Sequence, residues 1–197
     1  MNIAEKIIFK LRIKINKNVV FHKNTAFEGR KSCRIKAENG LLEINKKWSK
    51  NDPFPSVLVL REHAKVNVFG HFRIYSGARI YVNKNAVLNL GGGYINNDLT
   101  LSCFERIDIG HGVAISENVT IRDSDNHEIL NDNHQPTKPI KIGNRVWIGT
   151  NVTVLKGVTI GDGAIIAAGS LVNKDIPANC LAGGVPAKIL KSNIEWK

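Results

Sequence analysis

The sequence is poor in cysteine, and the three cysteines that it has form no pattern. Cys33, Cys103 and Cys180 are an odd number, lie far apart and include no CxxC pair. This usage argues against a disulfide framework and against a structural zinc site. Unpaired cysteines are typical of a reducing compartment, so we expect a cytoplasmic protein.

Long apolar runs are also missing. No hydrophobic segment approaches the length of a membrane-spanning helix, and charged residues interrupt the isoleucines near the N-terminus. We therefore expect no integral membrane segment and no secretion signal. The 197 residues are 43% hydrophobic, which excludes intrinsic disorder and predicts one domain with a full-sized core.

Acidic residues are scarce relative to basic ones. Seventeen Asp and Glu face 28 Lys and Arg, a formal net charge of +11. Such a charge favours anionic partners through long-range attraction. Nucleic acid, a membrane surface, a phosphorylated cofactor and an acidic glycan all fit this charge, as does a surface that only keeps the protein in solution.

A period of six residues dominates the C-terminal half. An aliphatic residue recurs at every sixth position, and a small or β-branched residue follows it four positions later. The aliphatic series is Ile142, Ile148, Val154, Ile160, Ile166 and Val172, and the second series is Val146, Val152, Val158, Ala164, Ser170 and Ile176. A shorter block in the same style begins at Ile109.

This period fits neither a helical face nor simple strand alternation. It requires short strands separated by regular corners, and three such units close a triangular coil of about 18 residues. Stacked coils pair as parallel strands about 4.8 Å apart, with the aliphatic residue pointing inward. The sequence therefore predicts a parallel β-helix, in which each coil packs only on its neighbours. Alternating segments upstream of residue 107 suggest further, irregular coils.

The repeat is broken once. Residues 123–139 leave the period between Ile121 and Ile142, which are not a multiple of six apart, so we expect an inserted loop there. At the ends, the apolar spacing of residues 1–16 predicts a short capping helix, with binding to a membrane surface as an alternative. Pro186 suits the first turn of a helix, so residues 186–197 are predicted to be helical.

The repeats resemble those of the hexapeptide-repeat acyltransferases over residues 107–190, in particular the sugar-modifying branch that includes maltose and galactoside acetyltransferases. The resemblance implies an all-β fold, a left-handed parallel β-helix over residues 17–185 with the inserted loop and short terminal helices. It also implies a homotrimer whose active sites lie between neighbouring subunits, and acetyl-CoA as the cosubstrate. We expect no metal and no nucleic-acid partner.

The inserted loop is the expected place for catalysis. Long polar loops in compact domains are usually functional, and a histidine can both accept and return a proton near neutral pH. The resemblance makes His127 the general base. Asp123, Asp125 and Glu128 are all candidates to orient its ring. The alternative for His127 is a solvent-exposed loop histidine without a catalytic role, and this is our interpretation of His134.

The resemblance also assigns the cosubstrate site. The Thr150 backbone N–H is the expected oxyanion donor, and the small side chains of Ala167 and Ala168 would leave room for a pantetheine arm. The residues expected to contact acetyl-CoA are Trp147, Thr150, Ala167, Ala168, Lys174, Lys188 and Lys191. Lys191 stands where relatives often have arginine, which keeps the charge but removes a bidentate phosphate contact.

Family members bind the acceptor hydroxyl with an asparagine upstream of the repeats. A gap-free count places Asp98 at that position here, so Asn96, Asn97 and Asp98 are all candidates for acceptor binding. The predicted function is O-acetylation of a sugar hydroxyl in a cell-surface polysaccharide, such as a capsule or O-antigen unit, with an acidic acceptor favoured by the charge.

Three alternatives remain at this point. A small-molecule or antibiotic acetyltransferase would use the same cosubstrate site. A carbonic-anhydrase-like metal enzyme would need two histidines five residues apart, whereas His111, His127 and His134 are 16 and 7 apart. A non-catalytic β-helix that binds a polyanion would leave the loop with His127 unexplained.

Overall fold

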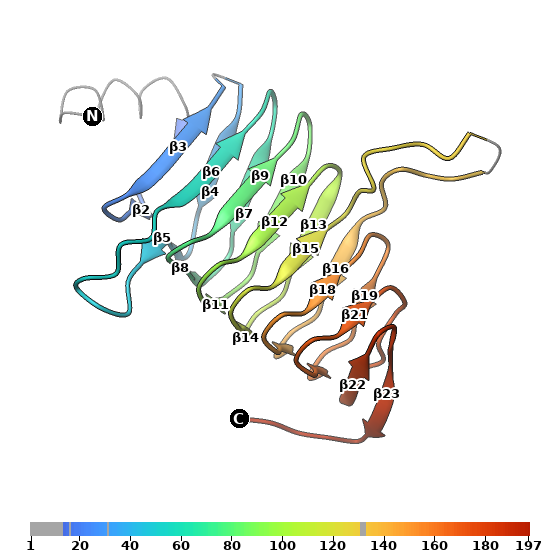
Figure 1. Cartoon of the computed structure of the whole chain (residues 1–197). Coiled ribbons are helices and arrows are strands. Elements are labelled where there is room, and N and C mark those ends of the chain that lie inside the picture. Colours follow the sequence, from blue (N-terminus) through green and yellow to red (C-terminus); the bar gives the residue numbers. More distant parts are fainter. Residues whose placement is uncertain (1–13, 16, 31, 131–132) are drawn as a thin grey trace.

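The computed structural model describes residues 14–15, 17–30, 32–130 and 133–197. Its strands form three sheets that wind into a prism (Figure 1), and within the winding every neighbouring pair of strands is parallel. We call the three sheets A, B and C. In each coil the chain contributes one strand to sheet A, one to sheet B and one to sheet C, and then returns to sheet A. The predicted all-β, parallel β-helical fold is confirmed.

The three sheets are built from short strands. Sheet A contains β1 (Lys14–Ile15), β4 (Arg34–Ala37), β7 (Lys65–Val68), β10 (Val87–Leu90), β13 (Arg106–Ile109), β16 (Ile140–Ile142) and β19 (Thr159–Ile160). Sheet B contains β2 (Val19–Phe21), β5 (Leu41–Lys46), β8 (His71–Tyr75), β11 (Gly93–Ile95), β14 (Val113–Ile115), β17 (Trp147–Ile148), β20 (Ile165–Ile166), β22 (Cys180–Gly184) and β23 (Ala187–Ser192). Sheet C contains β3 (Thr25–Gly29), β6 (Ser56–Leu60), β9 (Arg79–Val82), β12 (Thr100–Cys103), β15 (Thr120–Arg122), β18 (Thr153–Val154) and β21 (Leu171–Val172).

The six-residue period fills the core as predicted. Every member of the aliphatic series from Ile142 to Val172 is buried, and so is every member of the second series from Val146 to Ile176. These side chains stack on their equivalents in the coils above and below. The stack removes apolar surface from water without any single large side chain.

Coil length explains why the period is visible only in part of the sequence. Trp147 pairs with Ile165, eighteen residues further on, which is three hexapeptides. Upstream, Phe72 pairs with Gly93 after twenty-one residues and Gly93 with Val113 after twenty. The upstream coils therefore stack in the same three sheets but have longer corners, and the extra residues destroy the phase.

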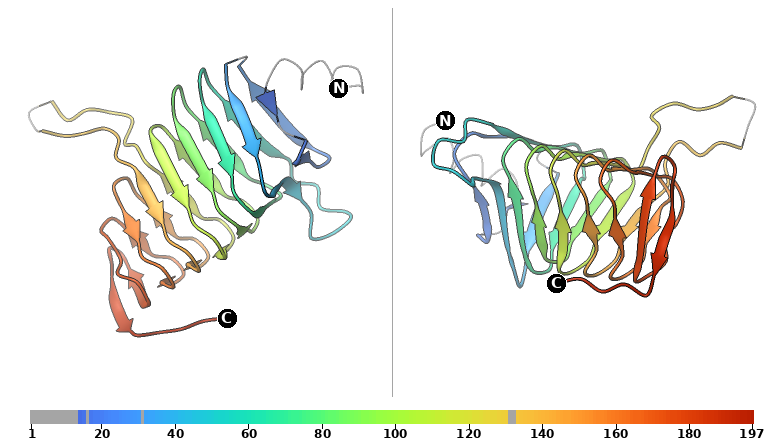
Figure 2. Two further views of the ribbon diagram at one scale, coloured as in Figure 1. Left: turned by 180° about the vertical axis from the view of Figure 1, so that it is seen from behind. Right: turned by 60° about the horizontal axis from the view of Figure 1, so that its bottom comes forward.

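Two coils carry long connections. Residues 47–55 join β5 to β6 at the edge where sheet B meets sheet C, which we call the B–C corner. Residues 123–139 join β15 to β16 at the edge where sheet C meets sheet A, the C–A corner. Figure 2 shows that the two loops project from different edges of the β-helix. The second loop lies where the repeat is broken.

The predicted C-terminal helix is wrong. Residues 187–192 form β23, which pairs antiparallel with β22, and Pro186 lies in the turn between the two strands. The last strand of a sheet leaves unpaired backbone N–H and C=O groups. Strand β23 supplies hydrogen bonds to β22, which a helix cannot do, and the segment after β23 runs back along the β-helix (Figure 1).

The predicted N-terminal helix falls mostly outside the described residues. Its last part is not helical, because Lys14 and Ile15 pair with Arg34 and Ile35 in sheet A. The β-helix therefore already includes residue 14. Within the described ranges the chain has no helix long and apolar enough to cross a lipid bilayer.

Candidate active site

The inserted loop begins from a fixed point. The Asp123 side chain is completely buried, and its carboxylate accepts hydrogen bonds from the backbone N–H groups of Phe104, Glu105 and Arg106 at 2.7, 2.9 and 2.9 Å. Burial raises the pKa of Asp123, and these hydrogen bonds oppose the rise. The Lys138 N–H donates to the Asp123 carbonyl at 3.0 Å, which closes the base of the loop.

His127 lies four residues beyond this anchor. Its side chain is exposed, and the described part of the chain contains no hydrogen bond to its ring. Of the three carboxylates considered for orienting it, Asp123 is occupied at the base of the loop, and Asp125 bonds to other residues. Only the backbone of the loop therefore positions His127 among the described residues, and its exposed ring is available to bind another molecule or subunit.

A second cluster ties the loop to the next coil. The Asp125 carboxylate lies 2.8 Å from His134 Nε2 and 2.5 Å from Lys156 Nζ, and Lys156 also donates to the Gln135 carbonyl at 2.5 Å. Hydrogen bonds from Lys156 and then His134 lower the pKa of Asp125. His134 is therefore not the solvated loop histidine that we expected, because its side chain is only 12% exposed.

Several predicted site residues form a column along the B–C corner. Consecutive coils place Asn97, Glu117, Thr150 and Ala168 at the second position of this corner, because Ile95, Ile115, Ile148 and Ile166 pair in sheet B. The spacing between coils is about 4.8 Å, so Thr150 lies one coil from Ala168 and two from Asn97. Asn96 is one residue earlier, at the first position of the same corner. We call this set the corner column.

Thr150 is partly exposed within the corner column. Its Oγ1 donates to the Glu117 carbonyl at 2.9 Å, and its own carbonyl accepts from the Gly169 N–H at 2.8 Å. Among the described residues, nothing accepts a hydrogen bond from the Thr150 N–H. Ala168, at the equivalent position of the next coil, is exposed and has only a methyl side chain.

The three acceptor candidates have different surroundings. Asp98 has a φ of +61° and donates its N–H to the Ser76 carbonyl at 3.0 Å, so it shapes the corner as Asn118 does in the next coil. Asn97 Nδ2 donates to Ser76 Oγ at 2.6 Å. Asn96 Nδ2 donates to Glu117 at 3.1 Å, while its Oδ1 is buried without a partner in the described structure. Asn96 therefore has an unused acceptor beside Glu117.

The remaining cosubstrate candidates lie in four places. Trp147 is on the outer face of sheet B, where Trp196 packs against it with ring centroids 5.9 Å apart, and Trp196 Nε1 donates to the Arg145 carbonyl. Lys188 and Lys191 are exposed on β23, at the end of the same sheet. Lys174 is exposed beyond β21, at the C–A corner. The corner residue Ala167 accepts a hydrogen bond from Ser170, whose hydroxyl also accepts from the Gly184 N–H.

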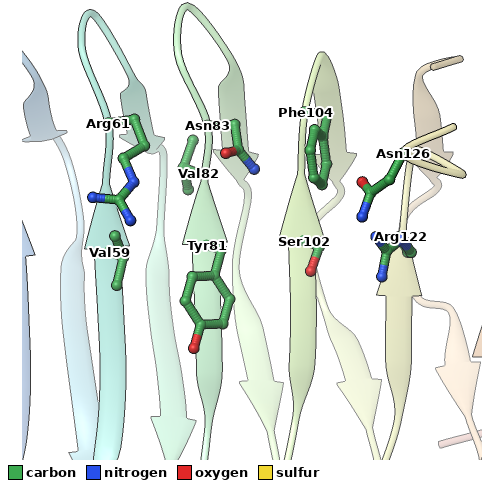
Figure 3. A pocket seen from close by; sticks show the side chains of 9 residues that line it. All are labelled: Val59, Arg61, Tyr81, Val82, Asn83, Ser102, Phe104, Arg122 and Asn126. Atoms are coloured by element: carbon green, nitrogen blue, oxygen red, sulfur yellow. The ribbon is translucent and has the colours of Figure 1, made fainter. Parts of the chain in front are cut away.

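A groove of about 230 Å³ lies on the outer face of sheet C, beside the loop (Figure 3). Arg61 and Arg122 belong to its two ends, and Tyr81 and Ser102 lie between them. Asn126, the residue before His127, also lines it. We call it the sheet C groove.

Within one chain the candidate groups do not meet. His127 and Lys174 belong to the C–A corner and the corner column belongs to the B–C corner, with the width of sheet C between them. Strand β15 alone spans three residues, about 10 Å, and the loop projects away from the β-helix (Figure 1). The candidate residues therefore form two separate sets on different edges of the β-helix.

Sequence reasoning missed several residues near these two sets. Lys156 lies in the hexapeptide repeat directly below the loop, and its period places it at the C–A corner, so a count of repeats would have found it. Glu117 follows from the same count. The sequence did not predict the sheet C groove, because the upstream coils have no clean period and their varying lengths determine which residues of neighbouring strands lie side by side.

Metal chemistry has no support from clustered ligands. Within the described ranges no group of three His, Cys, Asp or Glu side chains lies close enough together to hold a metal ion. The cysteines Cys33, Cys103 and Cys180 are buried and free.

The hexapeptide repeats are also the part of the chain that matches a known protein family. Residues 139–174 match the family described as bacterial transferase hexapeptide (six repeats). The chain is 39% identical over 118 residues to galactoside O-acetyltransferase of Escherichia coli K12, which covers 58% of this chain and 55% of that protein. It thus spans just over half the length of that relative.

This chain matches a larger share of two further proteins. The chain is 31% identical over 146 residues to the putative lipopolysaccharide biosynthesis O-acetyl transferase WbbJ of Escherichia coli K12, which covers 67% of this chain and 74% of WbbJ. The crystal structure of the polySia-specific acetyltransferase NeuO superposes with a TM-score of 0.51 at 26% identity and covers 94% of this chain and 89% of NeuO. These matches confirm the predicted left-handed β-helix.

Proposed function

Because this chain belongs to the family of bacterial hexapeptide-repeat transferases, we propose that it transfers an acetyl group from acetyl-CoA to a sugar hydroxyl in a cell-surface polysaccharide unit. The observation that carries the proposal is the corner column, in which the free Thr150 N–H lies next to the small side chain of Ala168. The loop that breaks the repeat supplies an exposed histidine.

The reaction assigns one role to each half of the site. His127 takes the proton from the acceptor hydroxyl as the oxygen attacks the thioester carbonyl carbon. The Thr150 N–H donates a hydrogen bond to the oxyanion that develops. When the tetrahedral intermediate collapses, the C–S bond breaks and the thiolate of CoA receives the proton from His127. Asn96, Asn97 and Asp98, in and beside the corner column, are the candidates that would bind the acceptor hydroxyl.

The cosubstrate would follow the C-terminal coils. Ala167 and Ala168 leave space for the pantetheine arm, Trp147 offers an aromatic face, and the exposed ammonium groups of Lys174, Lys188 and Lys191 attract the phosphates. In the described structure no carboxylate forms an ion pair with any of these three lysines. Acetyl-CoA and free cysteines together support a cytoplasmic reaction.

A homotrimer would bring the two halves together. His127 of one subunit would approach the corner column of the next, because a closed ring of three repeats the same interface around the axis. The proposal is supported by the separation of the two halves within one chain. A small-molecule acetyltransferase would use the same geometry, and only the acceptor would differ.

The decisive experiment replaces the base. His127→Asn should lower the rate of acetyl transfer to a panel of oligosaccharides by about 10²- to 10⁴-fold, while acetyl-CoA affinity, measured by calorimetry, stays within a factor of two. The ring is exposed, so the thermal unfolding temperature should not change. His111→Asn, which removes an exposed imidazole at the edge between sheets A and B, is the matched control.

Two results would contradict the proposal. Normal turnover by folded His127→Asn would remove this residue as the base. Failure of the unmodified protein to bind acetyl-CoA would favour a non-catalytic β-helix instead. Mass spectrometry of the acceptor panel identifies the acetylated sugar and separates polysaccharide units from small molecules.

A further inference from the structure

We propose that the sheet C groove binds a carboxylated saccharide and leads it to His127. This inference rests on the proposed function and names the acceptor class for it. The groove lies on the face of sheet C, between strands β6 and β15, and its lining ends at the first residues of the inserted loop (Figure 3).

The groove is built from residues in register on four neighbouring strands. Val59 pairs with Tyr81, Tyr81 with Ser102, and Ser102 with Arg122, so these side chains form one row across the sheet. Arg61, Asn83 and Phe104 follow two residues later on the first three of these strands and form a second row. Three strand spacings, about 14 Å, separate the strand that precedes Arg61 from the strand of Arg122, and Arg61 lies a further two residues along the strand direction. This span exceeds one sugar ring, so the groove fits an oligosaccharide.

Arg122 provides a guanidinium group that is not neutralised. Its Nε donates to the Ser124 carbonyl at 2.7 Å, and its guanidinium carbon lies 5.8 Å from the centre of the Phe104 ring. No carboxylate among the described residues forms an ion pair with it. The contacts hold the side chain in one orientation and leave its charge available, and a guanidinium binds a carboxylate with two parallel hydrogen bonds.

Arg61 provides the second cation at the far end. Its Nη1 lies 2.6 Å from Glu28 Oε1, with 41% and 58% of the two side chains exposed. An ion pair this exposed contributes little, so a ligand carboxylate can compete for Arg61. None of the described residues that line the groove carries a carboxylate. Both ends of the groove therefore favour a negative charge.

The middle of the groove suits a sugar. The Tyr81 and Ser102 hydroxyls and the Asn83 amide can each donate and accept hydrogen bonds, as sugar hydroxyls require. Tyr81 is 38% exposed, and its ring can offer an apolar face. Asn126 lines the end of the groove and His127 is the next residue, so a chain of sugars bound here ends beside the proposed base.

The test measures binding separately from transfer. The probes are an oligosialic acid and its carboxyl-reduced, neutral derivative of the same length, titrated by calorimetry without acetyl-CoA. We expect Arg61→Gln and Arg122→Gln each to weaken oligosialic acid binding about tenfold, while the neutral derivative binds equally to all variants. Arg34→Gln removes an exposed arginine from the outer face of sheet A and should leave binding within a factor of two.

Three outcomes would overturn the inference. The first is unchanged affinity for oligosialic acid in a folded Arg61→Gln, Arg122→Gln double variant. The second is an equal loss for the neutral derivative. The third is tighter, arginine-dependent binding of a single-stranded oligonucleotide of equal charge, which would make the groove a nucleic-acid site. Arg61 is remote from the loop, so its variant also tests the groove if Arg122→Gln disturbs the loop.

The same titrations separate this inference from the proposed function. If oligosialic acid binds with the expected arginine dependence and no acetyl transfer occurs, the groove stands and the transferase proposal fails. If transfer to oligosialic acid proceeds and binding ignores both arginines, the transferase proposal stands and the groove fails.

Discussion

Among the described residues, Glu43 and Asp123 are the buried carboxylates, and their surroundings shift their pKa values in opposite directions. Burial raises the pKa of Asp123, whose partners are uncharged backbone N–H groups. Burial also disfavours ionised Glu43, but hydrogen bonds from His71, Lys46 and His22 outweigh it and lower the pKa of Glu43 to about 2. Only Glu43 is therefore stabilised in its charged form.

Glu43 should make the protein sensitive to acid. A carboxyl group whose pKa falls on folding contributes stability above its unfolded pKa, near 4.5, and that stability is lost as the pH falls toward 2. Asp123 works in the opposite sense, since protonation favours the folded state when the pKa is raised. We expect Glu43→Gln to lower the free energy of unfolding at pH 6 by about 2 kcal/mol.

Denaturant unfolding at several pH values checks this prediction. The difference between the unmodified protein and Glu43→Gln should shrink steadily from pH 5 to pH 2.5. Glu105→Gln, an exposed carboxylate on the same β-helix, is the control and should show no such trend. A Glu43→Gln difference that is constant over this range would mean that packing, not charge, determines the loss.

The inserted loop depends on one lysine from the coil below it. Lys156 is only 16% exposed and contacts Asp125, His134 and Gln135. Without these contacts the base of the loop stays anchored at Asp123 but its outer part loses its tie to the β-helix. Because a displacement of about 1 Å can cost a factor of 10² in rate, Lys156→Met should lower kcat for acetyl transfer at least about tenfold.

The prediction separates positioning from binding. Acetyl-CoA affinity should stay within a factor of two, and limited proteolysis should cut the loop faster in Lys156→Met. Lys141→Met, which removes an exposed lysine from the outer face of sheet A, should change neither. Unchanged kcat in Lys156→Met would show that the loop needs no tie to the next coil.

At the level of elements, the sequence predicted what the period controls. The buried series from Ile142 to Val172 and the loop at residues 123–139 follow from a strict count of six. The hairpin of β22 and β23 does not, because a proline before a short apolar segment precedes a helix and a turn equally well. Whether residues 187–192 form a strand or a helix depends on the unpaired edge of sheet B, and this edge exists only after the coils have stacked.

The candidate site shows the same division. The positions of Thr150 and Ala168 in the corner column follow from the regular repeat, which places them one coil apart. The cluster around Lys156 and the sheet C groove join residues from different coils whose lengths vary, so only the structure aligns them. Asp98 illustrates the limit, because a gap-free count places it at the acceptor position and its φ of +61° gives it a corner-forming role.

At the scale of the whole molecule, the separation of His127 from the corner column predicts that one active site needs two chains. His127→Asn removes the base but keeps the corner column. Ala168→Trp fills the exposed space beside Thr150 but keeps the histidine. Each variant alone should be inactive, and each should elute as a trimer of the 21.8 kDa chain.

Co-expression of the two variants should restore activity. In randomly mixed trimers, half of the histidines come from Ala168→Trp chains, and half of the columns that they face come from His127→Asn chains. About a quarter of the sites are then intact, so we expect about a quarter of the unmodified activity. If both halves belonged to one chain, no mixed trimer would contain an intact site. Activity near zero in co-purified mixed trimers would therefore place the whole site within a single subunit, whereas separately purified variants mixed without exchange should stay inactive in either case.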